Sequence, residues 1–323
     1  YGEFRGVAVR YYDLALSNGA RWTSHPNGVF NPGAQNIVFD ALAAPYATPT
    51  GLTSLTIEGV PLSALLQAQQ LTGLQLTLKA GMQAGLPLAN PKQAGLLLQG
   101  TIFQSFGNWE GTEMTLDLVI SPAIYTSDKP GNIVLIWKAG MTLAQALTIC
   151  LSTAYPNVPI EMHIADQLIQ SHDEIHRCST LEQLAQTVSD ITAGHFLGKD
   201  YAGVQISMQG GVILVWDNTY LQTPIQLNFI DLIGQPTWIQ PLVMQVKTVM
   251  RADIQLGDQI LMPQGLQNAP GIVQTAAASM PSNLKYKSSF QGQFTVTEMR
   301  HIGNYRSPDG AAWATIMNCT ANG

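Results

Sequence analysis

The chain has 323 residues, of which 46% are hydrophobic and 11% are charged, and its net charge is −6. This length accommodates two or three domains, and so low a charge content argues against intrinsic disorder, which needs many charges and few apolar residues. The acidic balance argues against binding of duplex nucleic acid through phosphate neutralisation. A surface poor in charge is typical of a chain that other chains cover, because charged residues are depleted in interface cores.

The sequence contains no apolar run of the ~18 residues that a transmembrane helix needs, so we expect no membrane insertion by this chain. Residues 1–5 lack the apolar core of a signal peptide. The three cysteines, Cys150, Cys178 and Cys319, are odd in number and widely spaced. This pattern favours a reducing compartment during folding over a disulfide framework.

Residues 1–122 alternate between apolar and polar side chains, as β-strands do. The clearest run extends from Met114 to Ile120. We expect a hairpin loop at residues 107–111, and one helix that begins near Pro61 and ends at Gly73. This pattern predicts a small antiparallel barrel or sandwich that carries one helix.

A central segment has a different character and predicts two helices. The apolar run from Ile133 to Trp137 is typical of a short buried strand. Thr142 is followed three residues later by Gln145, which is the spacing of a capping box at a helix start. Ser179 and Glu182 have the same spacing and predict the start of the second helix.

The central segment ends in a predicted hairpin, in which the run from Val204 to Met208 is joined to the run from Val212 to Trp216 by a two-glycine turn. We therefore expect an α/β module over residues 123–221 that folds on its own core. An alternative stays open for parts of residues 123–140 and 200–221, which would then form strands that pair with one of the β-barrels.

Residues 222–323 are β-like again. Val243–Val249 alternates, and the segment from Asn268 to Lys287, rich in Pro, Ala, Ser and Asn, predicts a long surface loop. The last two strands are expected at residues 291–300 and 313–319. The predicted fold class is mainly β with an α/β insertion, in three domains: 1–122, 123–221 and 222–323.

The segment from His172 to His176 is the strongest candidate for a metal site. A helical metalloprotease motif needs His-Glu-x-x-His, whereas Asp173 occupies the second position here and the glutamate comes one residue later. A zinc site is therefore the minor alternative, and a solvated loop before a capped helix is the main interpretation. The candidates for acid/base chemistry are Asp117, Asp253 and Asp258, and none has an obvious partner at short range, so turn or surface roles are favoured.

The sequence lacks a Gly-x-Ser-x-Gly nucleophile elbow and a phosphate-binding loop. His301 lies after a predicted strand and is assigned a structural role. The six tryptophans could mark a sugar-binding face, but four of them lie in strand-like runs, so packing in the core or in an interface is favoured. If the rings of Trp238 and Trp313 are buried in the core, their removal should be costly. We therefore assign no catalytic residue, no cofactor-binding residue and no metal ligand, and we expect no cofactor.

The last third of the chain carries a distinctive order of motifs. The pattern D-I-x-x-G-D-x-I-x-x-P extends from Asp253 to Pro263, G-x-F-x-V-x-x-x-x-H-x-G from Gly292 to Gly303, and W-x-T from Trp313 to Thr315. This order resembles the C-terminal barrel of the baseplate hub proteins of contractile-tailed bacteriophages. The motifs specify turns and strand ends, and the N-terminal residues resemble the family only loosely.

The resemblance implies two tail-tube-like antiparallel β-barrels, at residues 1–122 and 222–323, and a homotrimeric ring of six barrels. Such a ring joins the sixfold tail tube to the threefold central spike and surrounds the DNA channel. The implied partners are other copies of the chain, tail tube or tube-initiator proteins, the central spike, baseplate wedge proteins and the tape measure protein. DNA would pass through the bore without sequence-specific binding. The implied location is the virion tail baseplate, assembled in the cytoplasm of the host bacterium.

Two other classes of protein stay open at this point. A secreted glycan-processing enzyme with β modules would need two carboxylates about 5–10 Å apart in a cleft. A type VI secretion spike base or a tube protein would share parts of the β architecture. A tube subunit needs one barrel in each chain, and a spike base continues into a β-helical needle.

Overall fold

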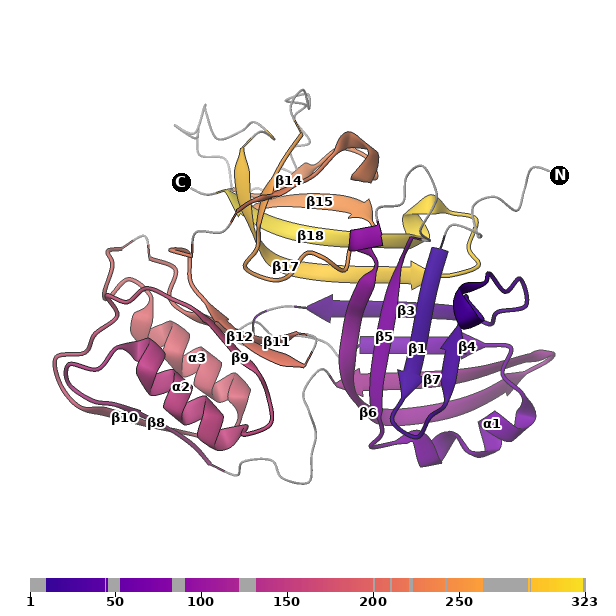
Figure 1. Cartoon of the computed structure of the whole chain (residues 1–323), viewed down its shortest axis with the longest axis horizontal. Coiled ribbons are helices and arrows are strands. Elements are labelled where there is room, and N and C mark those ends of the chain that lie inside the picture. The colour runs from indigo at the N-terminus through magenta and orange to yellow at the C-terminus, as the bar shows by residue number, and fades with distance from the viewer. Residues whose placement is uncertain are drawn as a thin grey trace. The chain divides into compact units, whose positions relative to one another are not determined.

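The computed structural model describes residues 10–43, 45, 53–82, 91–121, 132–199, 201–209, 211–220, 223–241, 243–263, 290 and 292–321. The predicted surface loop from Asn268 to Lys287 lies outside these residues. The chain divides into two compact units (Figure 1). Unit 1 comprises Tyr1–Ala43, Leu52–Ser121 and Thr223–Gly323, and unit 2 comprises Ala44–Gly51 and Pro122–Gln222.

Unit 1 is built on one 13-stranded sheet whose neighbouring strands are antiparallel, except for the parallel pair β13 and β16. Its main path has the order β14-β15-β18-β17-β3-β4-β7-β6-β5-β1-β2, and β16 joins it through β17. The strands are β1 (Arg10–Leu16), β2 (Arg21–Thr23), β3 (Asn36–Ala43), β4 (Thr53–Glu58), β5 (Gln75–Met82), β6 (Gly95–Glu110), β7 (Glu113–Ser121), β13 (Ile225–Gln226), β14 (Thr237–Gln240), β15 (Val243–Val249), β16 (Gln259–Leu261), β17 (Gln293–Asn304) and β18 (Trp313–Ala321).

Short helices connect the strands of unit 1. They are α1 (Leu62–Leu66) and the 3-10 turns η2 (Pro26–Gly28), η3 (Ala68–Leu71), η4 (Pro91–Gln93), η5 (Phe229–Asp231) and η6 (Gly310–Ala312). The helix predicted after Pro61 is therefore present, but it is broken at Gln67 into α1 and η3.

The alternating run from Met114 to Ile120 forms strand β7, as predicted, and its apolar residues Leu116, Leu118 and Ile120 are buried in the core. The hairpin between β6 and β7 is also where the sequence predicts it, but the predicted loop at residues 107–111 is wrong. β6 continues to Glu110, and only two residues separate it from β7. Gly107 lies within this strand, and a glycine is needed there because a Cβ would lie 2.9 Å from the Leu65 side chain of α1.

The first and last parts of unit 1 meet where β3 pairs with β17. The ladder extends from the pair Met299–Ala43 to the pair Asn304–Val38. Beside it, the ring of Phe39 packs edge-on against Trp313, with centroids 5.4 Å apart. Gly303 is required there because a Cβ would lie 2.2 Å from the Phe39 ring. The core of unit 1 therefore contains residues from both ends of the chain.

Unit 2 contains two small sheets and two helices. Its elements are β8 (Ile133–Trp137), α2 (Leu143–Ala154), β9 (Ile160–His163), β10 (Glu174–Cys178), α3 (Leu181–Thr192), β11 (Gln205–Gln209) and β12 (Val212–Trp216). β8 and β10 form an antiparallel ribbon, and β12 lies between β11, its antiparallel partner, and β9, its parallel partner. Helix α2 packs against β8 and β9, and α3 packs against β10 and β11 (Figure 1).

The helix starts of unit 2 test the capping predictions. The Thr142 box is confirmed, since the Thr142 hydroxyl accepts from Gln145 N–H and the Gln145 amide accepts from Thr142 N–H. The predicted start of α3 at Ser179 is wrong by one residue. Thr180 is the N-cap and accepts from Gln183 N–H at 3.2 Å, so the Glu182 spacing has no capping function.

The prediction of a mainly β fold with an α/β part is confirmed. Among the described residues, no helix is long and apolar enough to span a membrane. The three cysteines are buried and carry free thiols.

Candidate functional site

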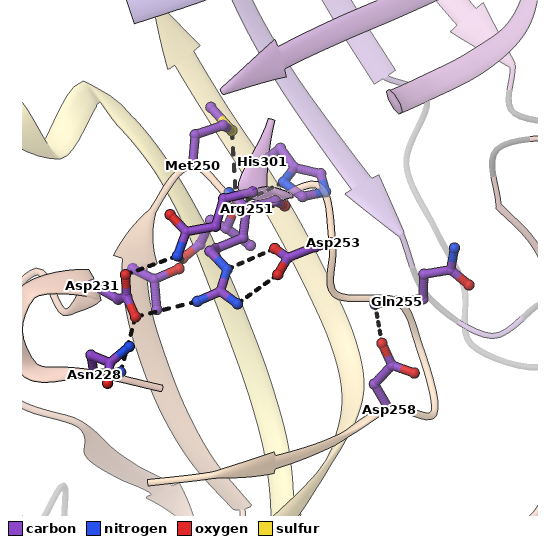
Figure 2. A network of polar contacts seen from close by, with 11 residues as sticks. Asn228, Asp231, Met250, Arg251, Asp253, Gln255, Asp258 and His301 are labelled. Carbon is purple, nitrogen blue, oxygen red and sulfur yellow. Dashed lines mark hydrogen bonds and ion pairs between the residues drawn. The ribbon is translucent and has the colours of Figure 1, made fainter. Parts of the chain in front are cut away.

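A network of polar side chains surrounds Arg251, which follows the end of β15 (Figure 2). Its guanidinium donates two hydrogen bonds to Asp253, both at 2.7 Å. Its Nη1 lies 3.4 Å from Oδ2 of Asp231. The side chains of Arg251 and Asp231 are 3% and 4% exposed, so this ion pair is shielded from water. Loss of one partner of such a pair leaves an uncompensated buried charge, which costs about 3–5 kcal/mol.

Asp231 of η5 connects this Arg251 network to the N-terminal part of unit 1. Its Oδ1 accepts from Gln93 Nε2 at 3.0 Å, and its Oδ2 accepts from the backbone N–H of Asn228 at 2.9 Å. The carbonyl of Gln93 accepts from the N–H of Ala252 at 2.8 Å. Since Gln93 lies between β5 and β6 in the sequence, the network joins segments that are far apart along the chain.

His301 of β17 and Thr315 of β18 complete the network. His301 Nδ1 and the Thr315 hydroxyl share a hydrogen bond of 2.9 Å, and the same hydroxyl accepts from Arg251 N–H at 2.9 Å. Burial lowers the pKa of His301 from 6.5 to about 4, so the imidazole is neutral at pH 7. A hydroxyl beside an imidazole is an arrangement found in nucleophilic catalysis. Here, however, His301 and Thr315 are only 2% and 0% exposed, so both side chains are shielded from solvent. The structural role of His301 stays a prediction.

A second arginine, Arg10 of β1, binds the turn after β17. Its guanidinium donates to the carbonyl oxygens of Asn304, Tyr305, Ser307 and Asp309 at 2.6–3.2 Å. It also lies 5.8 Å from the centre of the Trp313 ring, in cation–π geometry. Burial lowers the pKa of Arg10, although the charge of Asp309 opposes this shift.

The segment from His172 to His176 does not form the predicted solvated loop. Glu174–Cys178 is strand β10, paired with β8. Within it, Glu174 accepts from Gln170 Nε2 at 2.7 Å and lies 3.0 Å from Nε2 of His176. Burial raises the pKa of Glu174, but the Gln170 hydrogen bond and the charge of His176 outweigh it, so the pKa lies below its ordinary value. Among the described residues, no group of three or more His, Cys, Asp or Glu side chains is placed to hold a metal ion.

The three carboxylates considered for acid/base chemistry have separate roles. Asp117 of β7 accepts from Thr56 Oγ1 at 2.6 Å and from Asn108 Nδ2 at 2.5 Å, across three adjacent strands. Asp253 is bound to Arg251 as described above. Asp258 accepts the N–H of Gln255 at 2.7 Å within a turn (Figure 2). Each side chain therefore fixes local structure. Asp258 has the turn role that the sequence favoured, whereas Asp117 is partly buried within β7 and Asp253 is bound to a buried arginine.

The tryptophans divide between the core and the surface. Trp313 is 2% exposed and donates from Nε1 to the carbonyl of Gly81 at 2.9 Å, so its ring belongs to the core. Trp238 differs from Trp313. It is only partly buried on the short strand β14, where its ring stacks on Phe290 at a centroid distance of 5.7 Å. Trp109 is 64% exposed at the end of β6.

The sequence reasoning missed both arginine clusters. The available signal was a single arginine directly beside an apolar strand, Arg251 after Met250, in a chain that has only 15 Lys and Arg residues. A charge at the end of a buried strand needs partners, but the sequence does not show that Gln93 and Asp231 supply them. These clusters hold the sheet together.

The fold was compared with known proteins. No protein-family model matches the sequence, and no curated protein sequence matches it. Solved structures match almost the whole chain. The 43 kDa tail protein of prophage MuSo2 from Shewanella oneidensis is 7% identical, with a TM-score of 0.52 and coverage of 96% of both chains.

A second match comes from a secretion machine. An E. coli component of the type VI secretion system, described as structurally similar to the T4 bacteriophage tail proteins gp27 and gp5, is 8% identical with a TM-score of 0.53. The match covers 96% of this chain and 77% of that protein. At such low identities the matches show a shared fold, which is that of phage tail and type VI secretion proteins.

Proposed function

We propose that this chain is a structural component of a phage-type tail and forms the homotrimeric hub of its baseplate. The observation that carries the proposal is the match to a prophage tail protein over 96% of both chains. In the proposed ring, residues 1–122 and 222–323 supply two tube-like modules from each copy. Three copies then give pseudo-sixfold symmetry, which joins a sixfold tube to a threefold spike.

The proposed role is mechanical and involves no catalysis. The chemistry-bearing side chains described above are engaged in the Arg251 network, in the Arg10 cluster or in strand pairing. The proposed partners are tube or tube-initiator proteins, the central spike, wedge proteins and the tape measure protein, in the tail baseplate of a virion. DNA would pass through the bore without sequence-specific contacts.

A type VI secretion spike base is the second candidate, because the secretion component matches this fold with a TM-score of 0.53. It differs from the phage hub in its partners: a spike base continues into a needle, whereas a hub receives a separate spike protein.

The mass of the purified chain in solution tests the hub proposal. A mass of three chains, together with a closed ring of six similar modules by electron microscopy, is the expected result. A monomer at all concentrations, or a twofold dimer, contradicts the ring. An added tail tube protein should bind to the trimer and not to a variant that stays monomeric.

A further inference from the structure

The outer end of the β6–β7 hairpin carries an apolar group that the described part of unit 1 does not cover. Trp109 is 64% exposed, and Leu62 and Leu66 of α1 are 45% and 79% exposed. The indole N–H of Trp109 donates to the carbonyl of Gly111 at 2.9 Å, which holds the ring in place at the hairpin end. A ring that is already held loses little freedom on binding, and tryptophan is enriched among residues that dominate interfaces.

The direction of α1 places its first residues on the side of this hairpin end. Leu65 lies against Gly107 of β6, whereas Ala68 accepts a hydrogen bond from Ser105, two residues farther from the turn. The chain from α1 to η3 therefore runs away from the turn, and α1 lies beside the β6–β7 hairpin. Figure 1 shows α1 next to these two strands. We call Leu62, Leu66, Trp109, Glu110 and Glu113 the hairpin patch.

The hairpin patch also carries a repulsive pair of charges. Glu110 and Glu113 are directly opposite each other on β6 and β7, and both are exposed. Among the residues that the structure describes, neither carboxylate forms an ion pair. Like charges at directly opposite positions destabilise a strand pair. This pair comes directly after the Trp109–Met114 pair and points to the opposite face of the hairpin, so a partner that covers the hairpin end meets both apolar and acidic side chains. Such an end fits a partner surface that is apolar and basic.

Unit 2 has such a surface on the outer face of its β8–β10 ribbon. Alternation sends Leu135 and Trp137 into the core, so Ile136 points outward. Ile136 is directly opposite Ile175 of β10, and these two side chains are 48% and 60% exposed. A cross-strand isoleucine pair facing water is unusual for a surface that has no partner.

The charged groups beside this isoleucine pair are mainly basic. Arg177 is exposed on the same face of β10, opposite Val134, and Lys138 follows β8 and is exposed. Among the described residues of this face, the one carboxylate is that of Asp173, which already accepts the N–H of Ala139 at 2.8 Å. We call Val134, Ile136, Lys138, Ile175 and Arg177 the ribbon patch.

We propose that the hairpin patch of one copy of this chain binds the ribbon patch of a second copy. Trp109 and the two leucines would cover the isoleucine pair, and Glu110 and Glu113 would pair with the basic side chains. Two different surfaces that bind head to tail generate a ring when the rotation closes. The proposal therefore rests on the proposed ring and assigns one of the contacts that closes it.

A charge-swap experiment tests the contact. Glu113→Lys alone and Arg177→Glu alone should each weaken self-association about tenfold, measured by sedimentation at several concentrations. The double variant should recover most of the loss, because the pair is restored with reversed signs. Asp166→Lys is the matched control, since it reverses an exposed charge outside both patches and should leave self-association unchanged. Single variants that associate like the wild type, or a double variant without recovery, overturn the proposal.

Cross-linking between two tagged chains identifies the partner. One chain carries Thr112→Cys at the hairpin turn and the other carries Val134→Cys on the ribbon, and the three native thiols are buried. A disulfide that links the two differently tagged chains is expected only when the two variants are mixed. If the wild type is a trimer and the two variants do not cross-link, this contact is contradicted but the proposed ring is not. If the wild type is a monomer and the variants do not cross-link, both the contact and the ring are contradicted. Cross-linking within a doubly substituted chain, with none between chains, also contradicts the proposal.

Discussion

The two units of the chain are stabilised in different ways. Unit 2 is continuous apart from residues 44–51, and its helices start at local caps and pack on neighbouring strands. Unit 1 depends on contacts between residues that are almost a whole chain length apart, such as the β3–β17 ladder and the bonds from Arg10 to residues 304–309. The comparison indicates that the sequence specifies unit 2 through local signals and unit 1 through long-range partners. It also predicts two separable unfolding transitions.

The largest expected effect is that of Trp313→Ala, which removes a buried ring of unit 1. The loss should be about 3–5 kcal/mol of unfolding free energy, because the substitution leaves a cavity and removes the hydrogen bond to Gly81. Trp238→Ala is the matched control and should cost roughly 1–2 kcal/mol, because that ring is only partly buried. In denaturant unfolding, both substitutions should shift only the transition of unit 1. A shift of both transitions by Trp313→Ala would contradict independent units.

Arg251→Ala should cost about 3–5 kcal/mol, because it leaves the buried Asp231 carboxylate without its ion pair. Arg21→Ala is the control, since Arg21 pairs with Asp13 at the surface and its removal should cost much less than the loss of Arg251. Chemical denaturation with tryptophan fluorescence measures both. Equal losses of unfolding free energy from the two substitutions would show that burial of the ion pair does not determine its contribution.

Acidification should destabilise unit 1 through His301. Its pKa is about 4 in the folded chain and near 6.5 when unfolded, so the unfolded state binds the proton first as the pH falls. The stabilising effect of the neutral imidazole is complete above about pH 6.5 and is lost as the pH falls towards 4, by roughly 3 kcal/mol in total. His301→Gln should remove this part of the pH dependence. Parallel stability curves for the two proteins between pH 7 and 4 would contradict the assignment.

The smallest expected effect concerns a helix cap of unit 2. Thr142→Ala removes the capping box of α2 and should cost about 1 kcal/mol. Ser179→Ala is the control and should have little effect, because Thr180 is the N-cap of α3. Only the unit 2 transition should move. A loss from Ser179→Ala as large as that from Thr142→Ala would contradict the observed cap.

Local signals explain what the sequence could predict. The Thr142 box and the alternation of β7 each lie within about ten residues, so periodicity and spacing are enough to find them. Strand β10 was missed because Glu174–Cys178 contains few apolar residues. It is a strand because β8 supplies a partner, and that partner is more than thirty residues earlier.

The candidate site was less predictable than the fold. The partners of Arg251 include Asp231 and Thr315, which no spacing rule connects with it. The exposure of Trp109 fits the turn residues around it, but the sequence did not show that β6 would continue through it to Glu110. Motif reasoning did identify Asp253 and Asp258 as part of a recurrent pattern, and their observed hydrogen bonds at turns agree with that interpretation.

The β3–β17 ladder has a consequence for synthesis on the ribosome. β3 emerges about 250 residues before its partner, which at roughly 5–20 residues per second is a delay of some tens of seconds. During that time the edge of β3 is open and could pair with other nascent chains. Unit 2, whose strands and helices pair mostly with neighbours in the sequence, can fold while strands β13 to β18 are still being made. A product of premature termination would lack β17 and β18 and would therefore keep the edge of β3 open.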